Sequence, residues 1–137
     1  MSSIHIEQIR PELTWKLRQK VLYPEGKLAE MGIDEDADGY HFAAFQDNYI
    51  VGIVSLFKQG DRFQFRKLAV DASVQSQGIG SALLNYVTGF AKNENGKTLW
   101  CNARLTAIPF YIKHEFTHTG KFFSKNGFDY EILEKVI

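Results

Sequence analysis

The chain has little cysteine and no excess of charge of either sign. Cys101 is the single cysteine among 137 residues, so no internal disulfide can form, and this usage is typical of a reducing compartment. Basic and acidic residues number 16 each, which gives a formal net charge of zero. The basic excess expected of a nucleic-acid-binding protein is therefore missing, and the neutral balance favours chemistry on small molecules.

Long apolar runs are also missing. The longest, YIVGIVSLF, is far below the roughly 20 residues that a membrane-spanning helix needs. The start, MSSIHIEQIR, contains no apolar signal core. We therefore expect no membrane partner and a cytoplasmic location. Apolar residues make up 45% of the chain, and internal repeats and linkers are absent, so we expect one domain over residues 1–137.

The stretch Phe63–Phe90 passes from a strand pattern through a polar loop into a helix pattern. Apolar residues alternate with polar ones in its first part, and a slip in the phase predicts a β-bulge at Arg66 or Lys67. The later apolar residues recur at helical spacing and predict a helix whose first turn contains Gly78 and Gly80. The N–H groups of that turn favour an anion, and glycine lets a phosphate approach the backbone.

Two common nucleotide-binding signatures are absent from this stretch. The P-loop pattern G-x-x-x-x-G-K-[ST] does not occur, so its phosphate-binding lysine and magnesium-binding hydroxyl are missing. The dinucleotide fingerprint G-x-G-x-x-G requires glycine or alanine where Leu83 stands, and an acidic residue about 20 positions further on. The nearby strand Thr98–Asn102 offers no such residue. A glycine turn that binds no ligand remains the structural alternative.

Gln75, Gly78 and Gly80 match the pattern Q/R-x-x-G-x-G/A, and the stretch resembles the pyrophosphate loop of the GNAT superfamily of N-acetyltransferases. A second segment, WCNARLTAIPFYIKHEF from Trp100 to Phe116, is similar to the family's next strand and helix, N-A-R…A-x-x-F-Y-x-K-x-G-F. The two motifs stand in the family's order. At Glu115 the chain departs from the usual glycine, so the resemblance does not extend to the C-terminal cap of this helix, whereas Tyr111 is unaffected.

The resemblance implies acetyl-coenzyme A as the acetyl donor. His5, His114 and His118 form no metal-ligand spacing with His41 or Cys101, so no metal is expected. In that family the loop amides hold the pyrophosphate, and the preceding strand lines the acetyl and pantetheine arm. The tyrosine of the F-Y pair lies near the thioester sulfur, so Tyr111 is the expected acid for the departing thiolate. Asn102 is expected to hydrogen-bond the pantetheine. The expected cofactor-binding residues are Leu68, Ala69, Val70, Gln75, Ser76, Gln77, Gly78, Ile79, Gly80, Ser81, Asn102 and Tyr111.

Strand and hairpin patterns fill much of the remaining chain. Sequential hairpins imply antiparallel neighbours, whereas the central helix returns the chain to a parallel strand by a right-handed crossover. With the resemblance, these patterns predict an α/β (α+β) fold whose mixed sheet has about seven strands, mostly antiparallel with one parallel, splayed pair, flanked by about four helices. The expected elements are strands from Ile4 to Ile9, Tyr40 to Gln46, Tyr49 to Lys58, Leu99 to Asn102, Phe116 to Lys121 and Tyr130 to Val136, and helices from Pro11 to before Pro24 and from Thr106, a candidate N-cap, to Lys113.

The region from Glu25 to Tyr40 is rich in carboxylates and contains a short expected helix around Leu28. Its charge would attract a protonated amine, with a solvated charge run as the alternative. His41, at the start of the next strand, is the candidate general base because histidine changes charge near neutral pH. A surface or capping role is the alternative for His41. A backbone N–H near Leu68 or Ala69 is expected to bind the oxyanion.

These features predict an acetyl-coenzyme A dependent N-acetyltransferase, which moves the acetyl group to a primary amine of a small molecule or peptide by direct transfer in a ternary complex. A non-catalytic coenzyme A binding module, serving as a sensor or interaction domain, is the alternative. The absence of a carboxylate base on the central strand supports that alternative. A scaffold that binds nothing is a third class. Homodimers are common in the superfamily, so a homodimer stands among the candidate partners.

Overall fold

The computed structural model of the protein describes residues 3–137. Seven strands form one sheet in the hydrogen-bonded order β1-β2-β3-β4-β5-β7-β6. The described part of the chain contains three α-helices, α1 (Trp15–Leu17), α2 (Ile79–Asn93) and α3 (Ile108–Lys113). The predicted mixed sheet is confirmed, whereas the expected number of helices is slightly too high. The strands are β1 (His5–Ile9), β2 (Tyr40–Gln46), β3 (Tyr49–Gln59), β4 (Arg62–Val70), β5 (Thr98–Arg104), β6 (Thr117–Lys125) and β7 (Phe128–Val136).

The chain divides into two compact units. The first comprises the residues up to Phe57 together with Arg66–Val87, and the second comprises Lys58–Phe65 together with Thr88–Ile137. The strands β3 and β4 and the helix α2 therefore contribute residues to both. None of the helices found in residues 3–137 has the length and apolarity that crossing a membrane requires.

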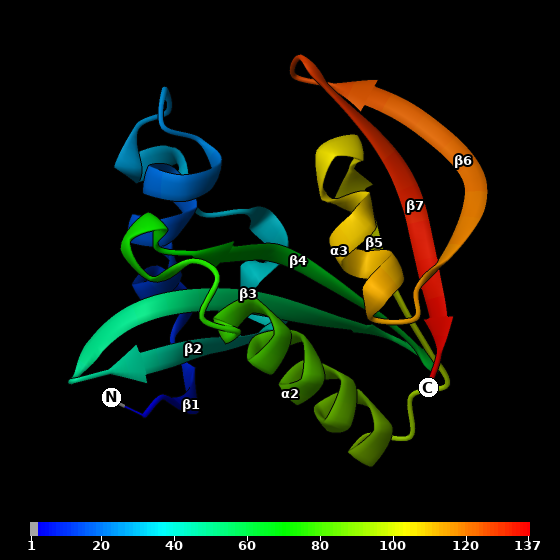
Figure 1. Ribbon diagram of the computed structural model, residues 1–137, viewed down its shortest axis with the longest axis horizontal. Helices are drawn as coiled ribbons and strands as arrows, with labels where there is room; N and C mark the ends of the chain where they lie inside the picture. Colours follow the sequence, from blue (N-terminus) through cyan, green and yellow to red (C-terminus); the bar gives the residue numbers. More distant parts are fainter. Residues whose placement is uncertain (1–2) are drawn as a thin grey trace. The chain divides into compact units, whose positions relative to one another are not determined.

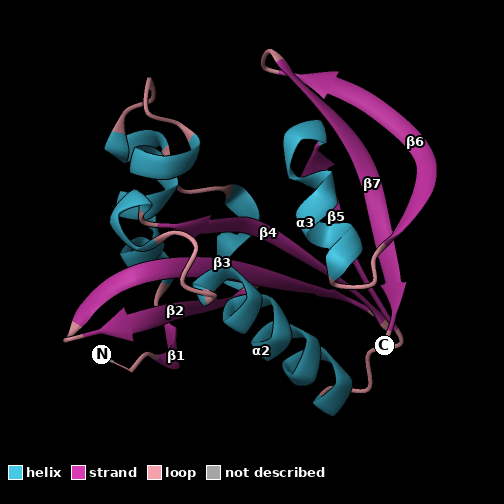
Figure 2. Ribbon diagram, viewed as in Figure 1, coloured by secondary structure: helices cyan, strands magenta, loops and turns pink. Residues whose placement is uncertain are grey.

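In the first unit, helical segments cover both faces of the antiparallel strands. Leu17 packs on one face against Ala43, Ile53 and Ala69. On the other face, a Cβ placed at Gly52 would lie 2.9 Å from side-chain atoms of α2, so glycine permits the close approach of that helix. The strand period of two puts neighbouring residues of β3 on these opposite faces. The β2–β3 pair and its tight turn are visible in Figure 2.

The segment 11–22 is helical but is not one regular α-helix. A 3₁₀ helix covers Pro11–Thr14, α1 follows, and a π-helix covers Arg18–Leu22. The sequence predicted that Leu13 and Leu17 lie on the same face of one helix. Leu17 is buried, but Leu13 is 43% exposed. The physical reason is the 3₁₀ turn after Pro11, because three residues per turn rotate Leu13 away from the face that α-helical spacing assigns to it.

Left-handed residues mark two features of the first unit that the sequence predicted. Asp47 and Asn48 have φ angles of 52° and 68°, as a tight β2–β3 hairpin requires. Lys67 has a φ of 59° inside β4, at one of the two positions predicted for a bulge. The carboxylate-rich region forms two 3₁₀ helices, Leu28–Glu30 and Asp34–Asp38, of which only the first was expected.

In the second unit, β5 pairs with β4 in parallel and with β7 in antiparallel orientation. The parallel pairing joins Arg62 to Thr98 and Gln64 to Trp100, and so confirms the predicted parallel pair. Figure 1 shows β6 and β7 as a long hairpin. Its strands extend further toward the turn than predicted, because Asn126 and Gly127 alone, with φ angles of 53° and 82°, reverse the chain.

The helix α3 begins later than predicted. A 3₁₀ turn at Leu105–Ala107 precedes it, and its N-cap is Ala107, which makes no side-chain capping bond. The prediction of Thr106 as the N-cap is therefore wrong. Pro109 stands in the first turn of α3, where its missing N–H removes one donor that the helix would otherwise leave unpaired.

Candidate functional site

The glycine loop lies between β4 and α2 in the first unit. Ser76 and Gly78 have φ angles of 68° and 80°, and the Gly78 carbonyl accepts a hydrogen bond from the Ala82 N–H at 3.0 Å. Gly78 therefore caps the helix. A Cβ at Gly78 would meet no atom within 4 Å, so the space beside it is open. Left-handed residues at a helix start turn backbone N–H groups toward one point, which is the geometry of an anion-binding nest.

Hydrogen bonds anchor the first residues of this loop to β4. The Gln75 side-chain amide donates to the Val70 carbonyl at 3.0 Å, which joins two of the predicted cofactor-binding residues. Asp71 accepts hydrogen bonds of 3.0 Å from the Ser73 N–H and from Lys20 Nζ. The Ser73 N–H first, and then Lys20, hold the pKa of the Asp71 carboxyl below its ordinary value. The loop therefore starts from a fixed position at the end of β4.

The other residues predicted to bind the cofactor in the first unit lie at the end of β4 and at the start of α2. Ala69 packs its side chain into the core, so only its backbone is available to a ligand. Leu68 and Val70 are half-buried. Lys67, with its left-handed backbone, directly precedes Leu68 and interrupts the extended conformation where the oxyanion donor is expected. The sequence-predicted residues Gln77, Ile79, Gly80 and Ser81 complete the loop and the first turn of α2.

In the second unit, Tyr111 on α3 packs among aromatic rings. Its ring centroid lies 5.6 Å from that of Phe65, 5.3 Å from that of Phe110 and 5.8 Å from that of Phe116. Burial, with a smaller effect from Cys101, raises the pKa of the Tyr111 phenol well above its ordinary value. The hydroxyl therefore stays protonated at neutral pH and can donate a hydrogen bond.

Cys101 on β5 is a free, buried cysteine. Burial raises the pKa of its thiol to about 12. The nucleophilic form of cysteine is the thiolate, so this thiol is inert at neutral pH. A covalent acetyl-cysteine intermediate at Cys101 is therefore disfavoured, in agreement with direct transfer.

Asn102 alternates with the buried residues Cys101 and Ala103 along β5 and is itself exposed. Its side chain consequently lies on the opposite face of β5 from Cys101. Tyr111 packs on the Cys101 face, because Phe65 and Cys101 both interact with it. The structure thus places Asn102 and Tyr111 on opposite faces of β5 and does not bring these two predicted residues together.

The C-terminal end of α3 keeps a glycine-type cap although glycine is missing. Glu115 has a φ of 69°. The Phe116 N–H donates to the Tyr111 carbonyl at 3.1 Å, and the Glu115 N–H donates to the Ile112 carbonyl at 3.0 Å. These two bonds and the contact between the Phe116 and Tyr111 rings constitute a Schellman motif. The cap that the missing glycine left open therefore forms with Glu115, and the motif fixes the backbone that carries Tyr111.

Replacing Glu115 with glycine should raise the free energy of unfolding by about 0.5–1 kcal/mol. A left-handed conformation costs an L-residue roughly 1–2 kcal/mol, and the greater backbone entropy of glycine in the unfolded chain offsets part of that gain. Urea unfolding measures the difference. As a control, Glu12→Gly should destabilise the protein, because Glu12 is not among the residues of positive φ. A Glu115→Gly protein no more stable than wild type would contradict the strain at this cap.

His41 occupies a buried position on β2 and is 2% exposed. Its Nδ1 lies 2.7 Å from Ser55 Oγ, and its Nε2 lies 2.8 Å from the Asp36 carbonyl oxygen. Both ring nitrogens are therefore engaged by protein groups, and neither is offered to an acceptor amine. The structure gives His41 a structural place in the core, in contrast to the predicted general base.

The same network contains an ion pair that sequence reasoning missed. Arg18 is fully buried and donates to the two carboxylate oxygens of Asp36 at 2.8 and 2.9 Å. It also donates to the Met31 carbonyl and to Ser55 Oγ. Burial disfavours the Asp36 carboxylate, but hydrogen bonds from Arg18 and the Ile33 N–H outweigh it and lower the pKa of Asp36. Arg18 lies in a segment where polar and apolar residues are mixed, so neither its burial nor its partner could be read from the sequence.

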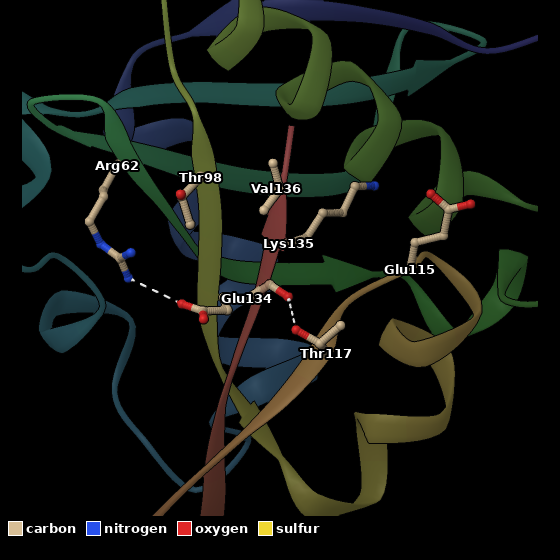
Figure 3. A pocket seen from close by; sticks show the side chains of 7 residues that line it. All are labelled: Arg62, Thr98, Glu115, Thr117, Glu134, Lys135 and Val136. Carbon is tan, nitrogen blue, oxygen red and sulfur yellow. Dashed lines mark hydrogen bonds and ion pairs between the residues drawn. The ribbon is translucent and has the colours of Figure 1, made fainter.

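A hollow in the second unit contains none of the predicted catalytic or cofactor-binding residues (Figure 3). Two of its polar side chains, Arg62 and Thr117, are paired with Glu134. Arg62 lies 3.6 Å from the Glu134 carboxylate, and Thr117 Oγ1 donates to the Glu134 carbonyl at 3.0 Å. Among residues 3–137, no three histidine, cysteine, aspartate or glutamate side chains are grouped to hold a metal ion. The lining residues are Arg62, Thr98, Glu115, Thr117, Glu134, Lys135 and Val136.

Comparison with known proteins places this architecture among acetyltransferases. A family profile described as "Acetyltransferase (GNAT) domain" matches residues 9–136. The uncharacterized N-acetyltransferase YitI of Bacillus subtilis (strain 168) is 24% identical over 139 residues, which cover 95% of this chain and 93% of that protein.

Solved structures share the fold at low sequence identity. A protein from Lactobacillus plantarum superimposes with a TM-score of 0.87, 20% identity and 98% coverage of both chains. A GNAT family acetyltransferase from Elizabethkingia anophelis, solved with acetyl-CoA bound, gives a TM-score of 0.77, 22% identity and 98% coverage of both. An aminoglycoside 6'-N-acetyltransferase complexed with coenzyme A gives 0.76, 16% identity and 96% coverage of both.

Proposed function

Because the chain belongs to the GNAT acetyltransferase family, we propose that it transfers the acetyl group of acetyl-coenzyme A to a primary amine of a small molecule or peptide. The observation that best supports this proposal is the loop at Gly78. There the sequence pattern, the left-handed backbone and the open space beside the glycine agree with a pyrophosphate site. Two similar proteins were solved with acetyl-CoA or coenzyme A, which supports the same donor here.

The proposed roles follow from the chemistry of each group. The loop from Gln75 to Ser81 binds the pyrophosphate through its backbone, and the end of β4 lines the acetyl arm. An N–H at Leu68 or Ala69, beside the irregular backbone of Lys67, stabilises the tetrahedral oxyanion. Tyr111, kept protonated by burial, donates to the departing thiolate. Asn102 offers an exposed amide for the pantetheine.

Carboxylates shape the proposed acceptor side. Asp34, Glu35 and Asp38 are exposed in a short 3₁₀ helix, whereas Asp36 is held inside by Arg18. Exposed carboxylates raise the local concentration of a protonated amine. The acceptor therefore carries a primary amine that is positively charged at neutral pH. A homodimer and the cytoplasmic location expected from the sequence stay predictions.

Isothermal titration with acetyl-coenzyme A, followed by thiol release with an amine panel, tests the proposal. We expect micromolar binding of the donor and amine-dependent release of coenzyme A with at least one of spermidine, kanamycin, benzylamine and a peptide with a free amino terminus. No binding to a folded protein would reject the cofactor assignment.

A coenzyme A binding module without transfer activity is the second candidate function. The observation in its favour is the buried, fully engaged His41, which leaves the reaction without the base suggested by the sequence. Donor binding without an acetylated product from any amine of the panel would favour this module. Product formation would reject it.

Tyr111→Phe should lower turnover by about 10²-fold, the lower end for a general acid, with nearly unchanged affinity for acetyl-coenzyme A. Phenylalanine preserves the ring contacts with Phe65 and Phe116, so α3 should keep its position. Steady-state kinetics and calorimetry provide the two readouts. Tyr86→Phe, on the partly exposed surface of α2, serves as the control and should match wild type. Equal turnover of the Tyr111→Phe enzyme would remove the acid role.

A further inference from the structure

A tyrosine and a lysine from distant parts of the chain meet at the irregular residue of the central strand. Lys67 Nζ donates a hydrogen bond to the Tyr23 hydroxyl, and the ammonium lies 4.4 Å from the centroid of the Tyr23 ring. Tyr23 is the C-cap residue of the π-helix Arg18–Leu22. Both residues are half-buried, so the contact is only partly shielded from water.

The backbone at this contact is strained. Lys67 has a φ of 59° within β4, a conformation that L-residues with long side chains rarely adopt and that persists only where surrounding structure imposes it. Such strain is concentrated at functional sites. The next residue, Leu68, is one of the two proposed oxyanion donors. Lys67, the partner of Tyr23, is therefore adjacent in sequence to a residue proposed to bind the oxyanion.

The neighbouring charges on these elements are already paired. Lys20, on the same π-helix as the Tyr23 cap, lies 3.0 Å from the Asp71 carboxylate. Arg66, which precedes Lys67 on β4, lies 3.4 Å from Glu35 in the carboxylate-rich region. The Lys67 ammonium is hydrogen-bonded to the Tyr23 hydroxyl, and an adjacent positive charge favours the ionised form of a phenol.

The Arg66–Glu35 contact also relates this strand to the acceptor side. Glu35 belongs to the exposed carboxylates proposed to attract the amine, and its partner is adjacent in sequence to Lys67. An ammonium drawn to these carboxylates would arrive beside the central strand. Because both ring nitrogens of His41 are engaged, the groups at this point of β4 are the alternative source of a base.

We propose that Tyr23 is the general base that deprotonates the acceptor amine, and that Lys67 is a positioning residue that stabilises the Tyr23 phenolate. The proposal rests on the acetyl transfer proposed above. An N–H bond of the acceptor ammonium breaks as an O–H bond forms at Tyr23. The freed nitrogen lone pair attacks the thioester carbonyl, the C–S bond breaks, and Tyr111 gives its proton to the coenzyme A sulfur. The second amine proton leaves to water, and Tyr111 regains a proton from water. Tyr23 then releases its proton to water.

The kinetic test uses Tyr23→Phe and Lys67→Met with the amine of the panel that wild type acetylates fastest. Tyr23→Phe keeps the ring beside Lys67 and should lower kcat/KM by about 10²-fold, with loss of the acidic limb of the pH profile and unchanged donor affinity. Lys67→Met should move that limb about one pH unit or more toward alkaline pH, because the phenolate loses its cationic neighbour. Lys67→Arg, which keeps the charge, should restore the limb toward wild type.

Two matched variants control for the substitutions themselves. Tyr49→Phe removes a hydroxyl from a residue that is 74% exposed. Lys58→Met removes a lysine whose ammonium lies 5.9 Å from the Phe63 ring centroid, without a phenol in that contact. Both should leave the pH profile unchanged.

A measurement without substrate separates this inference from the proposed function. Tyrosinate absorbance followed against pH should reveal one tyrosine that ionises earlier than the others in wild type, later in Lys67→Met and not at all in Tyr23→Phe. The absence of an early tyrosine would overturn the inference, as would an acidic limb that Tyr23→Phe leaves in place. Donor binding without product from any amine would overturn the transfer reaction, and with it the base role, whatever the absorbance shows.

Discussion

Arg18→Met should lower the free energy of unfolding by about 3–5 kcal/mol, the cost of leaving a buried carboxylate without its partner. Arg18 is fully buried and donates four hydrogen bonds, two of them to the Asp36 carboxylate. Methionine has a similar length but no donor, so Asp36 and Ser55 both lose a partner. Urea unfolding at neutral pH measures the loss. Since whole domains are stable by only about 5–15 kcal/mol, this is a large share of the total.

The destabilisation caused by Arg18→Met should become smaller as the pH falls. This pH dependence distinguishes a buried unpaired charge from lost packing, which does not depend on pH. In wild type the pKa of Asp36 is lowered, so its contribution is present above the unfolded value of about 3.9 and disappears as the pH falls through the folded value. Without Arg18, burial alone acts on Asp36 and favours protonation. We therefore expect a smaller difference from wild type near pH 4 than at pH 7. A difference independent of pH would contradict this account.

A surface arginine supplies the matched control. Arg10 lies 3.9 Å from Glu12, and both side chains are largely exposed. Arg10→Met should change stability by no more than about 0.5 kcal/mol, because exposed ion pairs contribute little. An equal effect of Arg10→Met and Arg18→Met would show that burial of the pair is not the cause.

Gly78→Glu should weaken acetyl-coenzyme A binding by at least about 100-fold, which corresponds to about 2.7 kcal/mol. The new carboxylate would stand beside the loop that receives the pyrophosphate, and two like charges 4 Å apart repel by about 4 kcal/mol at an effective dielectric constant of 20. Open space beside Gly78 lets the side chain enter without a clash. Isothermal titration measures the affinity.

The change also places a side chain on a backbone with a φ of 80°, so stability must be separated from binding. Gly127→Glu provides this separation. Gly127 has a φ of 82° in the β6–β7 turn, and a Cβ there would likewise meet nothing within 4 Å. Both variants should lose a similar amount of stability, but only Gly78→Glu should lose donor binding. Normal binding by a folded Gly78→Glu protein would reject the loop as the pyrophosphate site.

Local patterns predicted the secondary structure well where the deciding interactions lie close in sequence. The β2–β3 turn at Asp47 and Asn48, the irregular backbone at Lys67 and the start of α2 after Gly78 all depend on backbone conformations that particular residue types favour. The same reasoning failed at Leu13 and Thr106. There 3₁₀ turns shifted the helical phase and the cap, and such turns carry little sequence signal.

By itself the sequence determined the mixed sheet, its one parallel pair and the glycine loop before α2, because hydrophobic period, turn residues and motif spacing act over a few residues each. Only the tertiary structure decided the roles of the charged and titratable side chains. His41 and Arg18 are buried together with Asp36. A left-handed Glu115 forms the C-terminal cap of α3, which carries Tyr111. Lys67 donates a hydrogen bond to Tyr23. These roles depend on burial and on partners far away along the chain, and no local pattern encodes which distant residue will supply the partner.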